Sequence, residues 1–101
     1  MKHVRIIDAT LRDGMHAVSH QFTPEQMAVI AKGMEEAGVD TIEVGHGDGL
    51  GGSSMQYGFA KSSDAEYLSA VSKMLKKTKL DVLLIPGIGT IEDLKEVMEY
   101  G

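Results

Sequence analysis

The chain contains no cysteine, which excludes disulfides, thiolate nucleophiles and thiolate zinc sites. Any metal must therefore be held by oxygen or imidazole ligands. No apolar run approaches the ~18 to 20 residues that a membrane-spanning helix requires. The formal charge of −5 comes from scattered charges of both signs, without a basic cluster interleaved with aromatics. We therefore expect neither a membrane nor a nucleic acid as partner.

The start of the chain shows no basic stretch followed by an apolar core and a cleavage site, so we predict no secretion signal and expect a cytoplasmic location. At 101 residues the chain can bury a modest core, but it is small for an enzyme that must enclose a substrate. No linker or low-complexity segment marks a second domain. We therefore interpret residues 1–101 as one unit.

Three compact apolar runs predict β-strands. They cover residues 4–8, 39–44 and 81–85, and Pro86 and Gly87 stop the third. Such runs, rich in aliphatic and β-branched residues, are expected of parallel strands that are covered on both faces. The sequence therefore predicts a small parallel sheet.

A helix is predicted after each run. Thr23, Pro24 and Gln26 form the pattern of an N-cap, a proline at the first helical position and a capping box, and Gly38 suits the left-handed end of that helix. Ser63 or Asp64 begins the second helix and Thr90 the third, with Gly101 just past its end. The predicted buried stripes are Met27, Ile30, Ala31 and Met34, then Leu68, Val71, Met74 and Leu75, and finally Ile91, Leu94, Val97 and Met98.

The resulting βαβαβα order has strand starts about 35 to 42 residues apart, which is typical of right-handed parallel crossovers. A doubly wound sheet and a part of an eight-fold barrel both fit this order. A complete barrel normally needs about 250 residues, so three units cannot close one. Our prediction is an α/β fold, the N-terminal (βα)3 portion of a TIM barrel, with open edges at both sides of the sheet.

The loop after the first strand, residues 8–20, concentrates reactive groups. Arg12 adjoins Asp13, His16 follows three residues later, and Gly14 permits a tight bend between them. A carboxylate suits Mg²⁺ or Mn²⁺, a guanidinium can hold a carboxylate or enolate, and an imidazole moves protons near neutral pH. The same residues could equally pair within the loop while His16 is solvated. Spacing alone leaves both interpretations open.

Residues 8–14 (DATLRDG) resemble the signature of the metal-dependent lyases and synthases that include isopropylmalate synthase and hydroxymethylglutaryl-CoA lyase. The whole chain more closely resembles the 4-hydroxy-2-oxovalerate aldolase family. The further segments that carry this resemblance are MHA (15–17), IEVGHGDGL (42–50), GSS (52–54), YGF (57–59) and LIPGIGT (84–90).

The resemblance implies a metal-assisted retro-aldol reaction that splits 4-hydroxy-2-oxopentanoate into pyruvate and acetaldehyde. It implies that Asp13 binds Mn²⁺, or Mg²⁺ or another divalent cation, and that Arg12 stabilises the pyruvate enolate. By the same resemblance, His16 takes the proton of the 4-hydroxyl group, and Leu83 and Ile85 line the aldehyde side of the substrate pocket, although packing alone would explain both. It also implies an acylating aldehyde dehydrogenase as partner and a place in aromatic hydrocarbon breakdown.

The family's two other metal-binding histidines and its catalytic tyrosine have no counterpart among the matched residues. We therefore expect the chain to be part of a longer enzyme and inactive when isolated. Two other functions stay open. One is a non-catalytic β/α module that self-associates through its open sheet edges. The other is a related acyl-CoA lyase, against which His16 argues.

Gly47, Gly49 and Gly52 also satisfy the pattern G-x-G-x-x-G, which can indicate a dinucleotide site, but Asp48 would repel a pyrophosphate. His46 either reaches the mouth of the site or makes a structural hydrogen bond inside this loop. We interpret His3 and His20 as surface or loop-packing residues, because neither lies beside a second hard ligand in the sequence.

Overall fold

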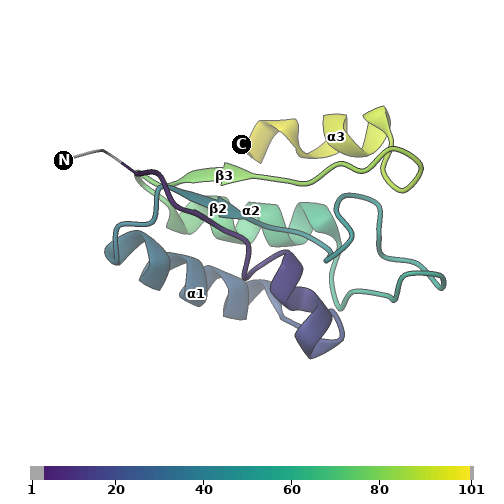
Figure 1. Cartoon of the computed structure of the whole chain (residues 1–101), viewed down its shortest axis with the longest axis horizontal. Coiled ribbons are helices and arrows are strands. Elements are labelled where there is room, and N and C mark those ends of the chain that lie inside the picture. Colours follow the sequence, from purple (N-terminus) through teal and green to yellow (C-terminus); the bar gives the residue numbers. More distant parts are fainter. Residues whose placement is uncertain (1–3, 101) are drawn as a thin grey trace.

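The computed structural model describes residues 4–100 as a three-stranded parallel sheet with helices packed on it (Figure 1). The elements are β1 (Ile7–Asp8), the 3-10 helix η1 (Asp13–Val18), α1 (Pro24–Glu36), β2 (Thr41–Glu43), α2 (Asp64–Met74), β3 (Lys79–Asp81), α3 (Ile91–Val97) and the 3-10 helix η2 (Met98–Tyr100). The sheet order is β1-β2-β3, with Ile7 beside Thr41 and Thr41 beside Lys79. This order contains no reversal of the kind that a doubly wound sheet has. Three consecutive units of barrel type, not closed, therefore confirm the predicted fold.

The helix starts form as the sequence predicts. Thr23, Ser63 and Thr90 are the N-caps, and in each case the cap side chain and the side chain three residues later bond each other's backbone N–H. Ser63, rather than Asp64, caps α2. Gly38 follows α1 with a φ of +89°, which is the left-handed conformation predicted for it. Local chemistry thus determines where each helix begins.

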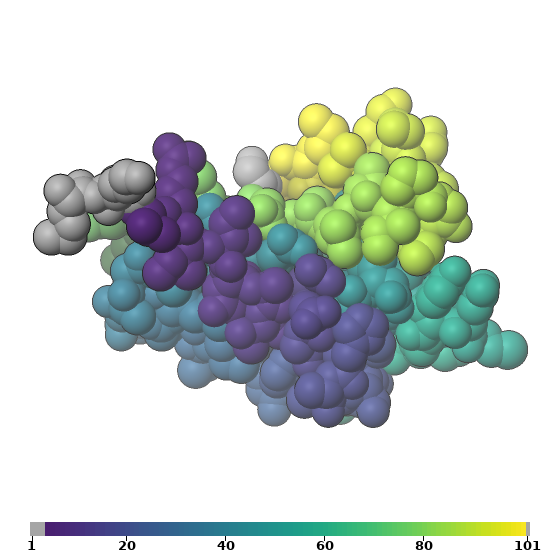
Figure 2. Space-filling view, viewed as in Figure 1, coloured from purple at the N-terminus to yellow at the C-terminus, as the bar shows by residue number. Residues whose placement is uncertain are grey.

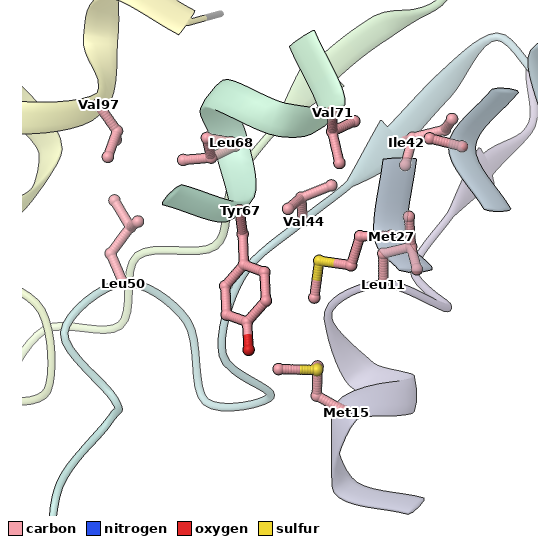
Figure 3. Close-up of a cluster of buried hydrophobic side chains, with 11 residues drawn as sticks. Leu11, Met15, Met27, Ile42, Val44, Leu50, Tyr67, Leu68, Val71 and Val97 are labelled. Atoms are coloured by element: carbon pink, nitrogen blue, oxygen red, sulfur yellow. The ribbon is translucent and has the colours of Figure 1, made fainter. Parts of the chain in front are cut away.

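The core lies between the helices and one face of the sheet (Figure 3). Ile42 of β2 and Met27 of α1 are fully buried there, together with Leu68 and Val71 of α2. Tyr67 lies at the centre, where its hydroxyl donates to the carbonyl of Phe22 at 2.6 Å. The predicted stripes of the first two helices therefore face the core except at Met74, which is not part of the core cluster. Tyr67 is a polar anchor that the periodicity did not predict.

The third strand is displaced from its predicted position. It covers Lys79–Asp81, whereas the apolar run had predicted residues 81–85. Gly45, with a φ of +140°, turns the chain out of the sheet after β2, so residues 82–85 have no continuous strand beside them. The N–H of Leu50, from the loop after β2, instead donates to the carbonyl of Leu83 at 2.9 Å.

The predicted stripe of α3 is wrong at two positions. Val97 is buried, but Ile91 is 60% and Met98 63% exposed, so Met98 does not fill the core. The helix has seven residues and continues into η2, and its inner side meets α2 through Leu94 and Val97. Within residues 4–100, no other element covers Ile91 at the start of α3 or Met98 just after its end. Periodicity indicates which side of a helix is apolar, not whether a partner covers it.

The residues around β1 are open to solvent. Val4, Ile6 and Ile7 are all more than half exposed, and Figure 2 shows this segment, in purple, uncovered on the face in view. β1 and β3 are the two edges of the sheet. None of the described helices is long and apolar enough to cross a membrane. Gly101, predicted to follow the third helix, and His3, predicted to be a surface or packing residue, lie outside the described residues.

Candidate functional site

The loops that follow β1 and β2 meet at the carboxyl edge of the sheet. The N–H of Gly45 donates to the carbonyl of Leu11 at 3.2 Å, and Arg12 Nη1 donates to the carbonyl of Gly47 at 3.0 Å. Parallel α/β folds carry their chemistry at this edge, because every strand points its following loop there. The structure therefore brings the loop of Arg12, Asp13 and His16 against the loop between β2 and α2, residues 44–63, which we call the glycine-rich loop.

Arg12 is held in one orientation by groups from β2 and its loop. Its Nε lies 2.7 Å from Glu43 Oε1, and Nη1 bonds the carbonyl of Gly47. The side chains of Arg12 and Glu43 are only 18% and 16% exposed, so this is a partly desolvated, charge-assisted pair. Arg12 Nη1 also lies 3.6 Å from Asp13 Oδ1. Loop pairing, one of the two interpretations of Arg12, is therefore present, and it fixes the guanidinium beside Asp13.

Glu43 and Asp81 form a pair of carboxylates that sequence reasoning missed. They are register partners at the ends of β2 and β3. Burial raises the pKa of the Asp81 carboxyl, the negative charge of Glu43 raises it further, and the Arg12 guanidinium partly opposes both effects. Asp81 Oδ1 is buried without a hydrogen-bond partner among the described residues. The available signal was an acidic residue near the end of the second apolar run and another at the start of the third.

Asp13 is the most open of the predicted site residues, with 70% of its side chain exposed. A carboxylate in this position can supply one hard ligand to a divalent cation. Among residues 4–100, no group of three metal-ligand side chains includes Asp13. Within residues 4–100, Asp13 therefore stands apart from any cluster of metal-ligand side chains.

Leu83 and Ile85 follow β3 toward the same edge, and both are half-buried. The carbonyl of Leu83 accepts the Leu50 N–H, and the carbonyl of Ile85 accepts the N–H groups of Ile88 and Gly89 at 3.0 Å. Leu83 therefore lies against the glycine-rich loop, whereas Ile85 begins the turn that leads into α3.

His16, His20, His46 and Asp48 form a group that we call the histidine cluster. His16 Nε2 lies 4.0 Å from Asp48 Oδ1, and the rings of His16 and His20 meet edge to face with centroids 5.1 Å apart. The rings of His20 and His46 are stacked at 3.7 Å. His20 is 6% exposed, which agrees with loop packing. The premise that it lies beside no second ligand was wrong.

His46 is a structural member of this cluster. The N–H of Asp48 donates to His46 Nδ1 at 3.0 Å, so this nitrogen accepts, and His46 Nε2 must carry the proton that it donates to the carbonyl of Gly58 at 2.8 Å. Both ring nitrogens of His46 are therefore occupied by hydrogen bonds. The structure shows the hydrogen bond inside the glycine-rich loop that was one of the two interpretations of this residue.

His20 is positioned by an unusual backbone conformation. Ser19 and His20 have positive φ values of 54° and 60°, a region that few residues other than glycine adopt. The N–H of His20 donates to Met15 at 2.7 Å, and its carbonyl accepts the N–H of Lys61 at 2.9 Å. Burial lowers the pKa of His20, His46 and His16 lower it further, and Asp48 partly opposes them. These effects favour the neutral form of His20, and its Nε2 has no hydrogen-bond partner in the described chain.

The glycines of the second loop make room for the imidazole rings. A Cβ atom on Gly47 would lie 2.5 Å from His16 Nε2, and one on Gly52 would lie 2.5 Å from His46 Nδ1. Gly49 has a φ of +90°, and a Cβ there would lie 2.6 Å from the carbonyl oxygen of Leu83. The spacing that resembles a dinucleotide motif is therefore explained by histidine packing and loop closure.

One group in the described chain has the composition of a metal centre. His16, His20 and Asp48 each offer a ligand atom, and these three atoms lie within 4.8 Å of one another. Two imidazoles and a carboxylate are a common ligand set for first-row transition metals. This group differs from the predicted ligand Asp13, and sequence reasoning missed it because its members are brought together by η1 and the glycine-rich loop.

Comparison with known proteins shows the class to which this fold and site belong. Residues 3–101 match the family model described as HMGL-like, so the chain belongs to the HMGL-like family.

Within this family, the chain is similar to proteins named 4-hydroxy-2-oxovalerate aldolase, as its motifs predicted. It is 67% identical to the one from Carboxydothermus hydrogenoformans over 99% of this chain and 30% of that protein. The identity is 62% with that of Pelotomaculum thermopropionicum, over 97% of this chain and 29% of the relative. It is 54% with that of Desulfitobacterium hafniense, over 100% and 30%. The chain thus spans about 30% of the length of the curated relatives it matches.

Proposed function

We propose that this chain supplies Arg12, Asp13 and His16 to the active site of a divalent-metal-dependent aldolase. The substrate would be 4-hydroxy-2-oxopentanoate, and the products pyruvate and acetaldehyde. The observation that supports this most strongly is the fixed guanidinium of Arg12. It is bonded by Glu43 and Gly47 at the carboxyl edge of the sheet, within 3.6 Å of Asp13. The identity of 54–67% to proteins named for this activity supports the same reaction.

The reaction needs a base for the 4-hydroxyl proton and positive charge for the enolate. In the proposal, His16 Nε2 accepts the hydroxyl proton, the bond between C3 and C4 breaks as the aldehyde forms, and its electron pair becomes the pyruvate enolate. Arg12 donates to the enolate oxygen, where its charge stabilises the transition state more than the ground state. A proton added at C3 then completes pyruvate.

Asp13 fits a role as one ligand of the divalent ion, because among residues 4–100 its exposed carboxylate has only the 3.6 Å contact with Arg12. When bound, such an ion would add Lewis-acid stabilisation of the developing oxyanion. We propose Mn²⁺, with Mg²⁺ as an alternative, and Leu83 and Ile85 as the apolar lining on the aldehyde side. We further propose that residues 1–101 form one partial barrel domain. One carboxylate binds such ions weakly, so the isolated chain should be inactive.

The same proposal extends to the partner enzyme, the cellular location and the metabolic role of the aldolase. Acetaldehyde is volatile and reactive, so an acylating aldehyde dehydrogenase would be a suitable partner to consume it. We propose a cytoplasmic location and a place in aromatic hydrocarbon breakdown on the basis of the family resemblance. Co-purification of the longer enzyme with such a dehydrogenase would test the partnership.

The function is best tested in a chimera that places residues 1–101 in the corresponding segment of the Carboxydothermus hydrogenoformans relative. We expect the chimera to release pyruvate from 4-hydroxy-2-oxopentanoate when Mn²⁺ is added, and the 101-residue chain alone to release none. Arg12→Lys should lower kcat by about 100-fold or more, because lysine cannot reproduce the oriented guanidinium. His16→Gln should have a similar effect.

Arg5→Lys is the matched control, because Arg5 is exposed and has no part in the site. It should leave kcat unchanged. Manganese-dependent pyruvate release by the isolated chain would contradict the proposal that residues 1–101 carry only part of the active site. A chimera that cleaves an acyl-CoA and not the hydroxy-keto acid would instead support the related lyase.

A second candidate function is a self-associating module without catalysis. The specific observation that favours it is the exposure of Val4, Ile6 and Ile7 next to the open edge of β1. Unpaired strand edges with apolar side chains favour pairing with another chain.

A further inference from the structure

We propose that His16, His20 and Asp48 form a second cation site, separate from Asp13, that binds a borderline transition-metal ion such as Zn²⁺. The site goes beyond the proposed aldolase function, because its existence depends only on the geometry of the histidine cluster. Its ligand atoms come from η1, from the turn after η1 and from the glycine-rich loop. The metal proposed for the aldolase reaction would be held elsewhere, at the exposed carboxylate of Asp13.

The distances between the three ligand atoms are close to those of an occupied site. They lie within 4.8 Å of one another, and His16 Nε2 is 4.0 Å from Asp48 Oδ1. Ligand atoms about 2.1 Å from a tetrahedral ion lie roughly 3.4 Å apart. Ion binding would therefore require the side chains to rotate and draw the ligand atoms together. The side chain of His16 is 46% exposed and that of Asp48 28%, so both have space to rotate.

An unsatisfied nitrogen provides an independent indication of a ligand. His20 is 94% buried, and its Nε2 has no hydrogen-bond partner in the described part of the chain. Leaving a buried polar atom without a partner destabilises the folded state, so such atoms in folded proteins call for a physical explanation. A metal ion bound by this imidazole would supply the missing partner.

His46, the remaining member of the histidine cluster, contacts two of the three proposed ligand residues and orients them. His46 stacks on His20 at 3.7 Å and accepts the N–H of Asp48, so one imidazole orients two of the three ligand residues. His46 itself has both nitrogens occupied and is not a ligand. Gly47 allows the ring of His16 to lie against the loop backbone. Outer groups of this kind orient the ligands of metal sites and strengthen binding.

The ligand types select the ion. Imidazole nitrogens favour Zn²⁺, Ni²⁺ and Cu²⁺ over Mn²⁺, whereas Mg²⁺ prefers oxygen ligands alone. Asp13 is a lone carboxylate, so the two positions differ in chemical character. The chain has no cysteine that could compete for these ions.

Occupation of this site would have one consequence for the reaction, and this consequence rests on the proposed function. His16 Nε2 cannot bind a metal ion and accept the hydroxyl proton at the same time. Zn²⁺ at the histidine cluster would therefore inhibit the enzyme by removing its base, whereas the ion held by Asp13 would be required for activity.

Zn²⁺ titration of the purified 101-residue chain by isothermal calorimetry tests the site directly. We expect one Zn²⁺ per chain, and little heat with Mg²⁺. His16→Gln and Asp48→Asn should weaken Zn²⁺ binding by more than the roughly 10- to 100-fold that loss of an outer-shell partner costs. Asp13→Asn is the matched control for Asp48→Asn and should leave the affinity unchanged.

His20→Gln changes a buried residue, so its circular dichroism spectrum must first match that of the wild type. The test does not depend on it, because His16 is half-exposed and its replacement leaves the core intact. A second measurement is modification by diethyl pyrocarbonate, read by mass spectrometry, from which Zn²⁺ should protect His16.

Two results would overturn the site: Zn²⁺ affinity unchanged by both His16→Gln and Asp48→Asn, or affinity lost in Asp13→Asn. Neither result bears on pyruvate release by the chimera. Conversely, a chimera without aldolase activity would leave the Zn²⁺ titration as the deciding measurement for the histidine cluster. The two proposals can therefore fail separately.

Discussion

Gly47 shows how the site depends on the absence of a single methyl group. The ring of His16 occupies the space that a Cβ atom on this residue would need, with three ring atoms within 2.7 Å of that position. Real Cβ atoms do not approach other atoms so closely, so any larger residue must displace the imidazole. Gly47 therefore determines the position of His16. The G-x-G-x-x-G pattern that contains this glycine could, from the sequence alone, have indicated a dinucleotide site.

Gly47→Ala is expected to move His16 away from Asp48 while leaving the fold intact. The Zn²⁺ affinity of the 101-residue chain and the kcat of the chimera should both fall, and the His16 ring signals in the nitrogen–proton NMR spectrum should shift. Gly33→Ala is the control, because no atom lies within 4 Å of a Cβ at that helical position. It should stabilise the chain by up to about 1 kcal/mol. An unchanged His16 spectrum in Gly47→Ala would contradict the packing.

At the residue scale, the sequence predicted which functional side chains of one loop lie near each other, but it did not predict their contacts with residues from other elements. Arg12, Asp13 and His16 share one loop, so their proximity was predictable. Glu43 and Asp81 are far apart in the chain and meet only through strand register. His20 depends on a positive φ and on stacking with His46. No local pattern indicates contacts of either kind.

Glu35 joins two secondary-structure elements through its carboxylate. It lies near the end of α1 and accepts the N–H groups of Lys76, Lys77 and Thr78, between α2 and β3, at 2.8 to 3.1 Å. These backbone hydrogen bonds lower the pKa of Glu35 from 4.5 to about 2. The negative charge therefore helps to hold the connection into the third strand.

Glu35→Gln tests this connection through its pH dependence. A carboxyl group with a lowered pKa in the folded state stabilises the fold fully above its unfolded value of 4.5, and this stability is lost as the pH falls toward about 2. Urea unfolding of the wild type should show this loss between those pH values, and Glu35→Gln should be less stable at pH 7 and less dependent on pH in that range.

Glu36→Gln is the control for this prediction, because Glu36 is an exposed neighbour in the same helix. It should retain the full dependence on pH. An equal loss of stability on acidification in Glu35→Gln and the wild type would show that another group carries the effect.

At the scale of the element, cap residues were predictable because they act within four residues of the chain. Thr23 and Gln26 bond each other's backbone without any distant partner. The limits of β3 were not predictable, because they depend on where Gly45 turns the neighbouring segment out of the sheet. The exposure of Met98 depends on which elements cover the end of α3, and no local pattern contains that information.

The whole molecule exposes apolar groups along its first strand. Val4, Ile6 and Ile7 are exposed, and β1 has an unpaired edge. In a closed barrel, further strands would pair with such edges and cover one face of the sheet. The three units described here therefore leave a surface that favours association.

We expect light scattering to show a mass above that of the monomer, rising with protein concentration. The double variant Ile6→Lys, Ile7→Lys should return the mass toward the monomer, because charge on a strand edge opposes pairing. Val29→Lys, on the exposed side of α1, is the control and should still associate. A monomeric wild type at all concentrations would exclude the self-associating module.

The three capping boxes also bear on how the chain folds during synthesis. Each box is complete once four successive residues have been made, whereas Ile7 must wait for Thr41 before β1 can pair with β2. Ribosomes add about 5 to 20 residues per second, whereas helices form in about a microsecond or less. Each helix start can therefore form and dissolve many times before its strand partner emerges, so the nascent chain samples the correct helix boundaries before the sheet assembles.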